Sequence, residues 1–251
     1  MKQSFGKAIL KNTIIYSLFF IGTLFLLCLV FYRIDAIATE ENAAMADAPA
    51  KTYPIVILDA GHGGIDSGAS PFEGVEEKHI NLSLAKKIGA FLNEGGAKVI
   101  YTRTEDAMLE FEGAPTRKTG DLLGRIEIAK KYSDAIFISI HMNTLPNEKY
   151  CGLQTFYSDQ NGLNQALARQ IQSDVCTYLQ PENNRKEKQT NGTLFLLDRL
   201  KQPAVLIECG FLTNPEECKK LQSNEYQNAL AFTLSRSILK FISDQGAEIN
   251  F

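Results

Sequence analysis

Residues 56–64 read VILDAGHGG, a run of branched apolar residues that ends in a glycine-rich turn holding His62. Residues 135–143, AIFISIHMN, repeat this arrangement and deliver a second histidine, His141, at the end of another apolar run. Short apolar runs of this kind are typical of strands buried on both faces, as in parallel sheets. The two stretches therefore predict two buried strands, each ending in an imidazole.

The remaining chain alternates between strand and helix patterns. Strands are expected at residues 54–58, 97–102, 134–140, 152–157, 193–196 and 203–207, and helices at residues 77–92, 122–132, 165–179 and 226–241. Asn214 followed by Pro215 predicts one more helix start, and residues 181–192 are expected to form a polar surface loop. This alternation predicts an α/β fold: a single domain over residues 53–244 with a largely parallel twisted sheet flanked by helices on both faces, followed by a tail at residues 245–251.

The N-terminal part carries a run without charge at residues 14–32. As a helix it would span roughly 28 Å, close to the hydrocarbon thickness of a bilayer. Lysines precede the run and acids follow it, so residues 1–13 are expected in the cytoplasm, residues 33–52 form an Ala-rich linker, and the domain lies outside. The alternative is a cleaved signal peptide ending near residues 44–46, but the apolar run is longer than a usual signal core, which favours a single-pass transmembrane anchor.

Composition excludes some classes of function. The chain has 251 residues and a net charge of -3, so it is long enough for one sizeable domain and lacks the basic signature of a nucleic-acid-binding protein. Its five cysteines show no C-x-x-C spacing, so no thiolate zinc site is indicated, and no disulfide is assigned among Cys151, Cys176, Cys209 and Cys218. Cys209 lies in a strand pattern and is expected to be a small buried side chain.

A third apolar run, residues 204–208 (AVLIE), ends in Glu208. Because ligands of open α/β sheets bind outside the carboxyl ends of the strands, we expect His62, His141 and Glu208 to converge there. Two histidines and one carboxylate with an open fourth position form a recurrent catalytic zinc site. Such a metal polarises a carbonyl and acidifies a water, and amide hydrolysis also needs a second carboxylate that carries a proton to the leaving nitrogen.

Three acids at the start of an expected helix are candidates for this second carboxylate: Glu73, Glu76 and Glu77. Each also has an ordinary explanation, because acids in a first helical turn interact favourably with the helix dipole. A lone histidine at a strand end is likewise often a hydrogen-bonded structural residue. The remaining histidine, His79, is expected to be a solvated surface residue.

Taken together, the motifs resemble those of the zinc-dependent N-acetylmuramoyl-L-alanine amidases over residues 53–242. The resemblance rests on ordered blocks: LDAGHGGID at residues 58–66, Glu77-Lys78 with Asn81-Leu82, Tyr101-Thr102-Arg103, Leu123 with Arg125 and Ala129, SIHMN at residues 139–143, and PAVLIECGFLTN at residues 203–214. It implies hydrolysis of the bond between the lactyl group of muramic acid and the first alanine of the peptidoglycan stem peptide.

Position by position, the resemblance implies that one zinc ion is bound by His62, Glu77 and His141. It makes Glu208 the catalytic carboxylate that activates the attacking water, a residue whose role the strand pattern alone left open between ligand and base. No substrate-binding residue is identified. Arg103 and Arg125 are candidates for binding a stem-peptide carboxylate, but structural ion pairs are the preferred interpretation.

A single anchor with a bare catalytic domain is similar to the germination-specific, CwlD-like amidases of spore-forming bacteria. These remove stem peptides from cortex muramic acid so that muramic-δ-lactam can form. The resemblance implies a domain on the cell-wall side of a membrane, at the developing spore. Since the chain has little else to grip the wall, a helper protein that holds substrate or steadies the metal site is a further hypothesis.

Two other interpretations remain open from the sequence. A zinc peptidase or a sugar deacetylase acting on peptidoglycan would use the same constellation of residues. A catalytically silent wall-binding or regulatory module is the alternative from a different class. The presence of all four residues, His62, Glu77, His141 and Glu208, argues against a silent module, which has no physical reason to assemble them.

Overall fold

The computed structural model describes residues 20–36 and 53–249 of the chain, which belong to two compact units, Met1–Lys51 and Thr52–Phe251. In the first unit, residues 20–36 form a helix. Among the described residues, no helix combines the length and apolar character needed to cross a membrane. Residues 1–19, which include the predicted cytoplasmic segment and the start of the predicted anchor, and residues 37–52 of the predicted linker lie outside the described residues.

The second unit is built on one six-stranded sheet in the order β2-β1-β3-β6-β4-β5. The strands are β1 (Ile55–Ala60), β2 (Lys98–Tyr101), β3 (Ile136–Asn143), β4 (Gln154–Tyr157), β5 (Lys188–Gln189) and β6 (Ala204–Phe211). All neighbours pair in parallel except β4 and β6, which are antiparallel. The predicted largely parallel sheet is therefore confirmed in its main part, and the antiparallel pair makes it a mixed sheet.

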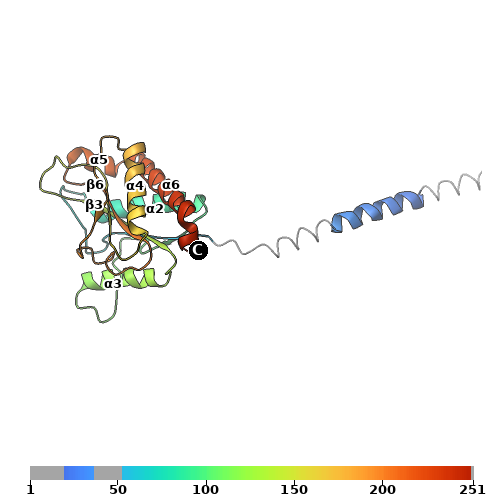
Figure 1. Ribbon diagram of the computed structural model, residues 1–251, viewed down its shortest axis with the longest axis horizontal. Helices are drawn as coiled ribbons and strands as arrows, with labels where there is room; N and C mark the ends of the chain where they lie inside the picture. Colours follow the sequence, from blue (N-terminus) through green and yellow to red (C-terminus); the bar gives the residue numbers. More distant parts are fainter. Residues whose placement is uncertain (1–19, 37–52, 250–251) are drawn as a thin grey trace, which may run out of the picture. The chain divides into compact units, whose positions relative to one another are not determined.

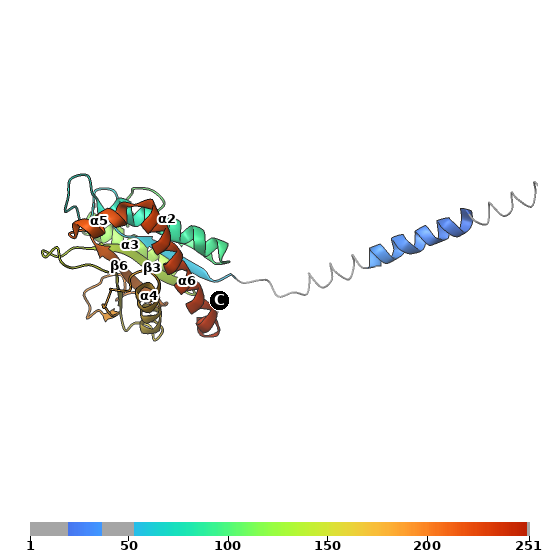
Figure 2. The same cartoon turned by 90° about the horizontal axis from the view of Figure 1, so that it is seen from above.

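Helices cover both faces of this sheet, as predicted (Figure 1). They are α2 (Glu77–Glu94), α3 (Arg117–Lys130), α4 (Asn164–Tyr178), α5 (Pro215–Gln222) and α6 (Asn224–Ile249). Helices α2, α4 and α6 lie on one face and α3 on the other (Figures 1 and 2). From β1 the chain moves to β2 on one side and then crosses back to β3 on the other. Because crossovers between parallel strands are right-handed, these two opposite movements place α2 and α3 on opposite faces.

Alternation along the central strands decides which side chains reach which face. In β3, Ile136, Ile138 and Ile140 pack into the core beneath α2, α4 and α6, whereas Phe137 packs into the smaller core beneath α3. Successive side chains of a strand point to opposite faces, so His141 belongs to the α3 face. The same alternation in β6 puts Glu208 on the α3 face, since Leu206 packs in the core on that side.

The last helix, α6, fixes α2 in place (Figure 2). Ser83 Oγ donates to Gln227 Oε1 at 2.7 Å, and the rings of Phe91 and Phe232 meet edge to face with centroids 5.6 Å apart. Lys87 adds hydrogen bonds to two asparagines of α6. These contacts hold the helix whose first residue is Glu77.

Two details of the expected secondary structure are wrong. Residues 193–196, expected as a strand, do not form one, since a turn covers residues 195–199, and the short strand β5 lies earlier, within the expected loop at residues 181–192. The third helix begins at Arg117, ahead of the expected residue 122. Its cap is Thr116, whose Oγ1 accepts a hydrogen bond from the Thr119 amide at 3.1 Å. Asn214 caps α5 as predicted, accepting from the Glu217 amide at 2.9 Å.

A buried polar network lies under the carboxyl edge of β1 and β3. Asp59 accepts hydrogen bonds from Thr102 at 2.7 Å and Ser139 at 2.6 Å and forms an ion pair with Arg125, which also pairs with Asp121 at 2.9 Å. Burial alone would raise the pKa of Asp59, but the Arg125 guanidinium and the two hydroxyls hold it below its ordinary value. Asp59 therefore stays ionised inside the protein.

The two arginines of this region hold the turn that follows β1. Arg103 donates to the carbonyls of Ala60 at 2.8 Å and Gly61 at 2.9 Å, and Arg125 donates to those of Ala60 at 2.9 Å and His62 at 2.8 Å. Both side chains are buried and their donors are occupied within the protein. The structural ion pairs preferred for these residues are confirmed for Arg125, whereas within the described residues Arg103 forms none and donates to backbone carbonyls instead.

This network predicts a large loss of stability in Arg125→Met. The substitution keeps an unbranched side chain but leaves Asp59 as a buried carboxylate without its cation, which is expected to lower the free energy of unfolding by about 3–5 kcal/mol. The measurement is urea denaturation at neutral pH. In the control, Lys130→Met, the lost ion pair with Glu127 is exposed, so the change should stay within about 0.5 kcal/mol. Equal losses in both variants would contradict the role given to Arg125.

Candidate functional site

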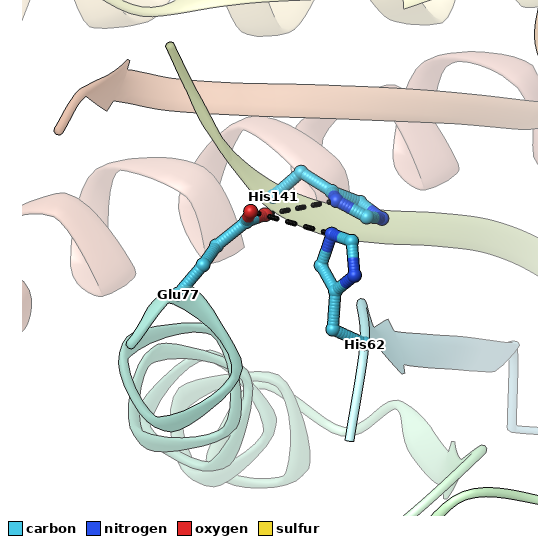
Figure 3. Close-up of side chains that lie close together, drawn as sticks. All are labelled: His62, Glu77 and His141. Carbon is cyan, nitrogen blue, oxygen red and sulfur yellow. Dashed lines mark hydrogen bonds and ion pairs between the residues drawn. The ribbon is translucent and has the colours of Figure 1, made fainter. Parts of the chain in front are cut away.

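His62, Glu77 and His141 meet at the carboxyl edge of the sheet, as the sequence predicted (Figure 3). His62 lies just after β1, Glu77 is the first residue of α2, and His141 lies in β3. Nε2 of His62 is 3.3 Å from Oε2 of Glu77, and Nδ1 of His141 is 3.0 Å from Oε1. The two imidazole rings are perpendicular neighbours, with centroids 4.9 Å apart. One carboxylate thus stands between two imidazoles.

The glycines of the turn after β1 allow this close approach. His62 itself has a φ of 61°, in the left-handed region that a side chain rarely adopts. A Cβ at Gly61 would lie 2.2 Å from Nε2 of His141, and a Cβ at Gly68 would lie 2.5 Å from Oε2 of Glu77. Any larger residue at Gly61 or Gly68 would have to push a side chain of the cluster away.

Glu77 is held as a carboxylate by its surroundings. Its oxygens accept hydrogen bonds from the amides of Ala69 at 2.9 Å and Met142 at 3.0 Å and from the side chain of Asn81 at 3.1 Å. Burial raises the pKa of Glu77, but the hydrogen bonds and charges of His141 and His62 lower it far below its ordinary value. A buried carboxylate kept ionised in this way is suited to binding a cation.

Asp66 supports His62 from behind. Its Oδ2 lies 3.0 Å from Nδ1 of His62, within ion-pair distance although not aligned as a hydrogen bond. Burial lowers the pKa of His62, but the contacts with Glu77 and Asp66 raise it above its ordinary value of 6.5. Carboxylates commonly orient the free nitrogen of a metal-binding histidine. No role was predicted for Asp66 from the sequence, although its position four residues after His62 indicates that the two side chains could meet.

Glu208 is the second carboxylate of the site. It is the register partner of His141 in the pairing of β3 with β6. Its Oε2 is buried and has no hydrogen-bond partner. Burial raises the pKa of Glu208 to about 7; His141 and His62 oppose this rise, and Glu77 adds to it. Unpartnered buried polar atoms are rare, and a perturbed carboxyl beside such a cluster marks a candidate functional residue.

The three donor groups fit a divalent metal ion. Their donor atoms lie within 4.8 Å of one another. Ligands of a tetrahedral zinc ion stand roughly 3.3 Å apart, given zinc–nitrogen and zinc–oxygen distances near 2.0–2.1 Å. The observed contacts of 3.3 and 3.0 Å match that spacing. A set of two imidazoles and one carboxylate is also the chemistry expected of a catalytic zinc site with an open position.

Other candidates of the sequence analysis lie away from this cluster. Glu73 is exposed, and Glu76 is 3.0 Å from His79, which is largely exposed, as expected. All five cysteines are free thiols, and Cys209 is buried, as expected.

A cavity of about 300 Å³ adjoins the cluster on the α3 face. His62 and His141 form part of its wall, and residues of α3 and residues 193–197 form other parts. It gives the cluster a space in which a reacting group of a ligand can lie next to both imidazoles.

The chain is similar in sequence and fold to known proteins. The chain is 35% identical, over 76% of its length and 81% of the relative's, to the germination-specific N-acetylmuramoyl-L-alanine amidase of Bacillus subtilis (strain 168). Among solved structures it is similar to the CwlD amidase from Clostridioides difficile in complex with the GerS lipoprotein, with 35% identity, a TM-score of 0.68, and coverage of 76% of this chain and 99% of that one.

It is also similar to the N-acetylmuramoyl-L-alanine amidase AmiC2 of Nostoc punctiforme, with 31% identity, a TM-score of 0.67, and coverage of 77% of this chain and 99% of that one. Residues 56–240 match the family described as N-acetylmuramoyl-L-alanine amidase, and this stretch contains all four residues of the site. The chain therefore belongs to the N-acetylmuramoyl-L-alanine amidase family of hydrolases.

Proposed function

We propose that this chain uses one zinc ion, bound by His62, Glu77 and His141, to hydrolyse the amide bond between N-acetylmuramic acid and L-alanine in peptidoglycan. The observation that supports it most is the convergence of two imidazole nitrogens on the Glu77 carboxylate, beside Glu208. Zinc at this place would polarise the scissile carbonyl and lower the pKa of the attacking water.

Glu208 is proposed as the base and then the acid of the reaction. A carboxyl with a pKa of about 7 can take up a proton and release it again near neutral pH. It would accept the proton of the attacking water and deliver it to the nitrogen of the departing alanine. Its unpartnered Oε2 leaves it free for this exchange.

We further propose a role in the spore cortex, where removal of stem peptides enables muramic-δ-lactam formation. The germination-specific relative from Bacillus subtilis supports this narrower assignment. The Clostridioides difficile relative was solved together with a lipoprotein, which supports a helper protein for this chain as well. Unaided cleavage of cortex fragments by the purified chain, with tight zinc binding, would argue against the need for a helper.

The proposed location is the outer side of a membrane, with residues 14–32 as a single-pass anchor. The support is the uncharged run itself and the lysines that precede it. Fractionation of expressing cells decides between this and the cleaved signal peptide. A full-length chain in the membrane fraction supports the anchor, and a shortened chain released from the cells contradicts it.

Zinc content tests the ligand assignment. The purified full chain is expected to hold about one zinc ion, as three-ligand catalytic sites do, and His141→Ala is expected to lose most of it. His79→Ala is the matched control, because this largely exposed histidine lies outside the cluster and its variant should keep its zinc. The measurement is elemental analysis of the dialysed proteins. Full zinc content in His141→Ala would refute the assignment.

Zinc affinity is expected to weaken as the pH falls. A histidine ligand must be neutral, and the pKa of His62 in the metal-free protein is raised above 6.5, so protons compete with zinc from a higher pH than for an ordinary histidine. Asp66→Asn removes one cause of that rise, so the decline should begin at a lower pH. At alkaline pH the same variant should bind zinc about 10–100-fold more weakly, because His62 loses its supporting carboxylate.

The pH dependence is measured by competition with a chelator over a series of pH values. Asp134→Asn, an exposed acid before β3, is the control and should follow the wild type. An unchanged pH profile in Asp66→Asn would contradict the proposed support of His62.

Glu208→Gln tests catalysis. The amide keeps the size of the side chain but does not accept a proton, so the rate is expected to fall by about 10²-fold or more while zinc content is retained. Glu216→Gln, an exposed acid in α5, should leave the rate unchanged. The assay is mass spectrometry of digested peptidoglycan. Amidase action frees intact stem peptides with an N-terminal alanine, a peptidase shortens them, and a deacetylase leaves them attached.

A further inference from the structure

The cavity beside the cluster has two chemically different walls. One wall comes from the first turns of α3 and carries Lys118. Another part of the lining comes from residues 193–197, which present mostly apolar side chains, among them Leu194 and Phe195. His62 and His141 also line the cavity. At about 300 Å³ the cavity is at the lower limit for ligand sites, so it suits a short part of a substrate next to the bond that is cut.

Among the described charged side chains that line the cavity, one cation has no partner and is available to an incoming anion. Asp59 and Asp121 are paired with Arg125, and Asp66 is in contact with His62. Lys118 is exposed, and within residues 53–249 no hydrogen bond or ion pair engages its ammonium group.

The position of Lys118 is not explained by the stability of its helix. The first turn of α3 contains Arg117 and Lys118 and no acidic residue. Cations at a helix N-terminus are unfavourable, because that end of the helix dipole is positive. Departures from local preference of this kind occur at functional sites. The ammonium group of Lys118 therefore presents a positive charge to the cavity.

We propose that Lys118 binds a free carboxylate on the stem-peptide residue that follows the alanine, and so favours stems that carry this carboxylate over stems in which it is amidated. The inference rests on the proposed amidase function. Lys118 would then bind the stem-peptide carboxylate, a role that Arg103 and Arg125 cannot fill because they are buried and their donors are occupied. The apolar residues 193–197 of the lining would lie against the alanine methyl group and the lactyl group, which carry no charge.

The test compares two ligands, N-acetylmuramoyl-L-alanyl-D-glutamic acid and the same compound with its α-carboxylate amidated. Binding is measured by calorimetry in the zinc-loaded full chain carrying Glu208→Gln, so that hydrolysis does not interfere. The free acid is expected to bind about tenfold more tightly than the amide, the value of one hydrogen bond to a charged group at an accessible site. Adding Lys118→Ala should bring the ratio of the two dissociation constants close to one, and Lys118→Arg should largely restore it.

Arg117→Ala is the matched control. It removes a cation from the same helical turn, but Arg117 lines a different cavity, so the preference should remain. Equal loss of preference in Arg117→Ala and Lys118→Ala would overturn the inference in favour of general attraction by the helix end. An absent preference in the parent, or one that survives Lys118→Ala, would overturn it as well.

The readout separates this inference from the proposed function. If the wild-type chain cleaves neither compound but the Lys118-dependent preference in binding is present, the subsite stands and the amidase assignment fails. If the wild-type chain cleaves both compounds and Lys118→Ala leaves the ratio of the two dissociation constants unchanged in the Glu208→Gln chain, the amidase assignment stands and the subsite fails.

Discussion

The ion pair of Asp59 with Arg125 is the interaction on which the rest of the site depends. It lies in the interior, where each charge alone would be unfavourable, and it is completed by the hydroxyls of Thr102 and Ser139. The same guanidinium donates to the carbonyls of Ala60 and of the residue with the left-handed backbone. A strained turn persists only when its surroundings fix it, and this pair forms those surroundings together with Arg103.

The two carboxylates at the sheet edge, Glu77 and Glu208, differ in their hydrogen-bond partners, and this difference suits them to different chemical roles. Glu77 is buried and Glu208 is half-buried with its Oε2 inaccessible, and desolvation raises the pKa of each. Glu77 receives donors from three other groups and both histidines, so its pKa falls and it remains a permanent anion. Glu208 has an oxygen without a partner, so its pKa stays raised near neutrality. The first environment suits a ligand and the second suits a group that exchanges protons.

Sequence patterns predicted the parts of the fold that follow from periodicity. The three buried runs that end in His62, His141 and Glu208 could be recognised because apolar continuity is a strong signal for strands in a parallel sheet. Residue 77 could not be separated from its two acidic neighbours by periodicity alone, because all three fall at one helix start. The family motif identified it, and the structure gives the physical reason: only Glu77 faces both imidazoles.

Other features left no mark on the apolar pattern. Helix α3 was expected to begin five residues late, because its first turn holds polar residues and depends on the Thr116 cap. That error also concealed Lys118 as a residue of the site's wall. Residues 193–197 read as a strand because they are apolar. Their side chains cover the α3 face of the sheet, but their backbone does not pair with a neighbouring strand.

The docking of α6 on α2 has a consequence for how the protein matures. A chain is synthesised from its N-terminus, so the segment that bears Glu77 emerges long before residues 224–249, against which it packs. Until that final segment arrives, Ser83 and Phe91 lack their partners. Assembly of the edge that brings Glu77 to the two histidines is therefore tied to completion of the polypeptide, so a half-made chain lacks the complete site.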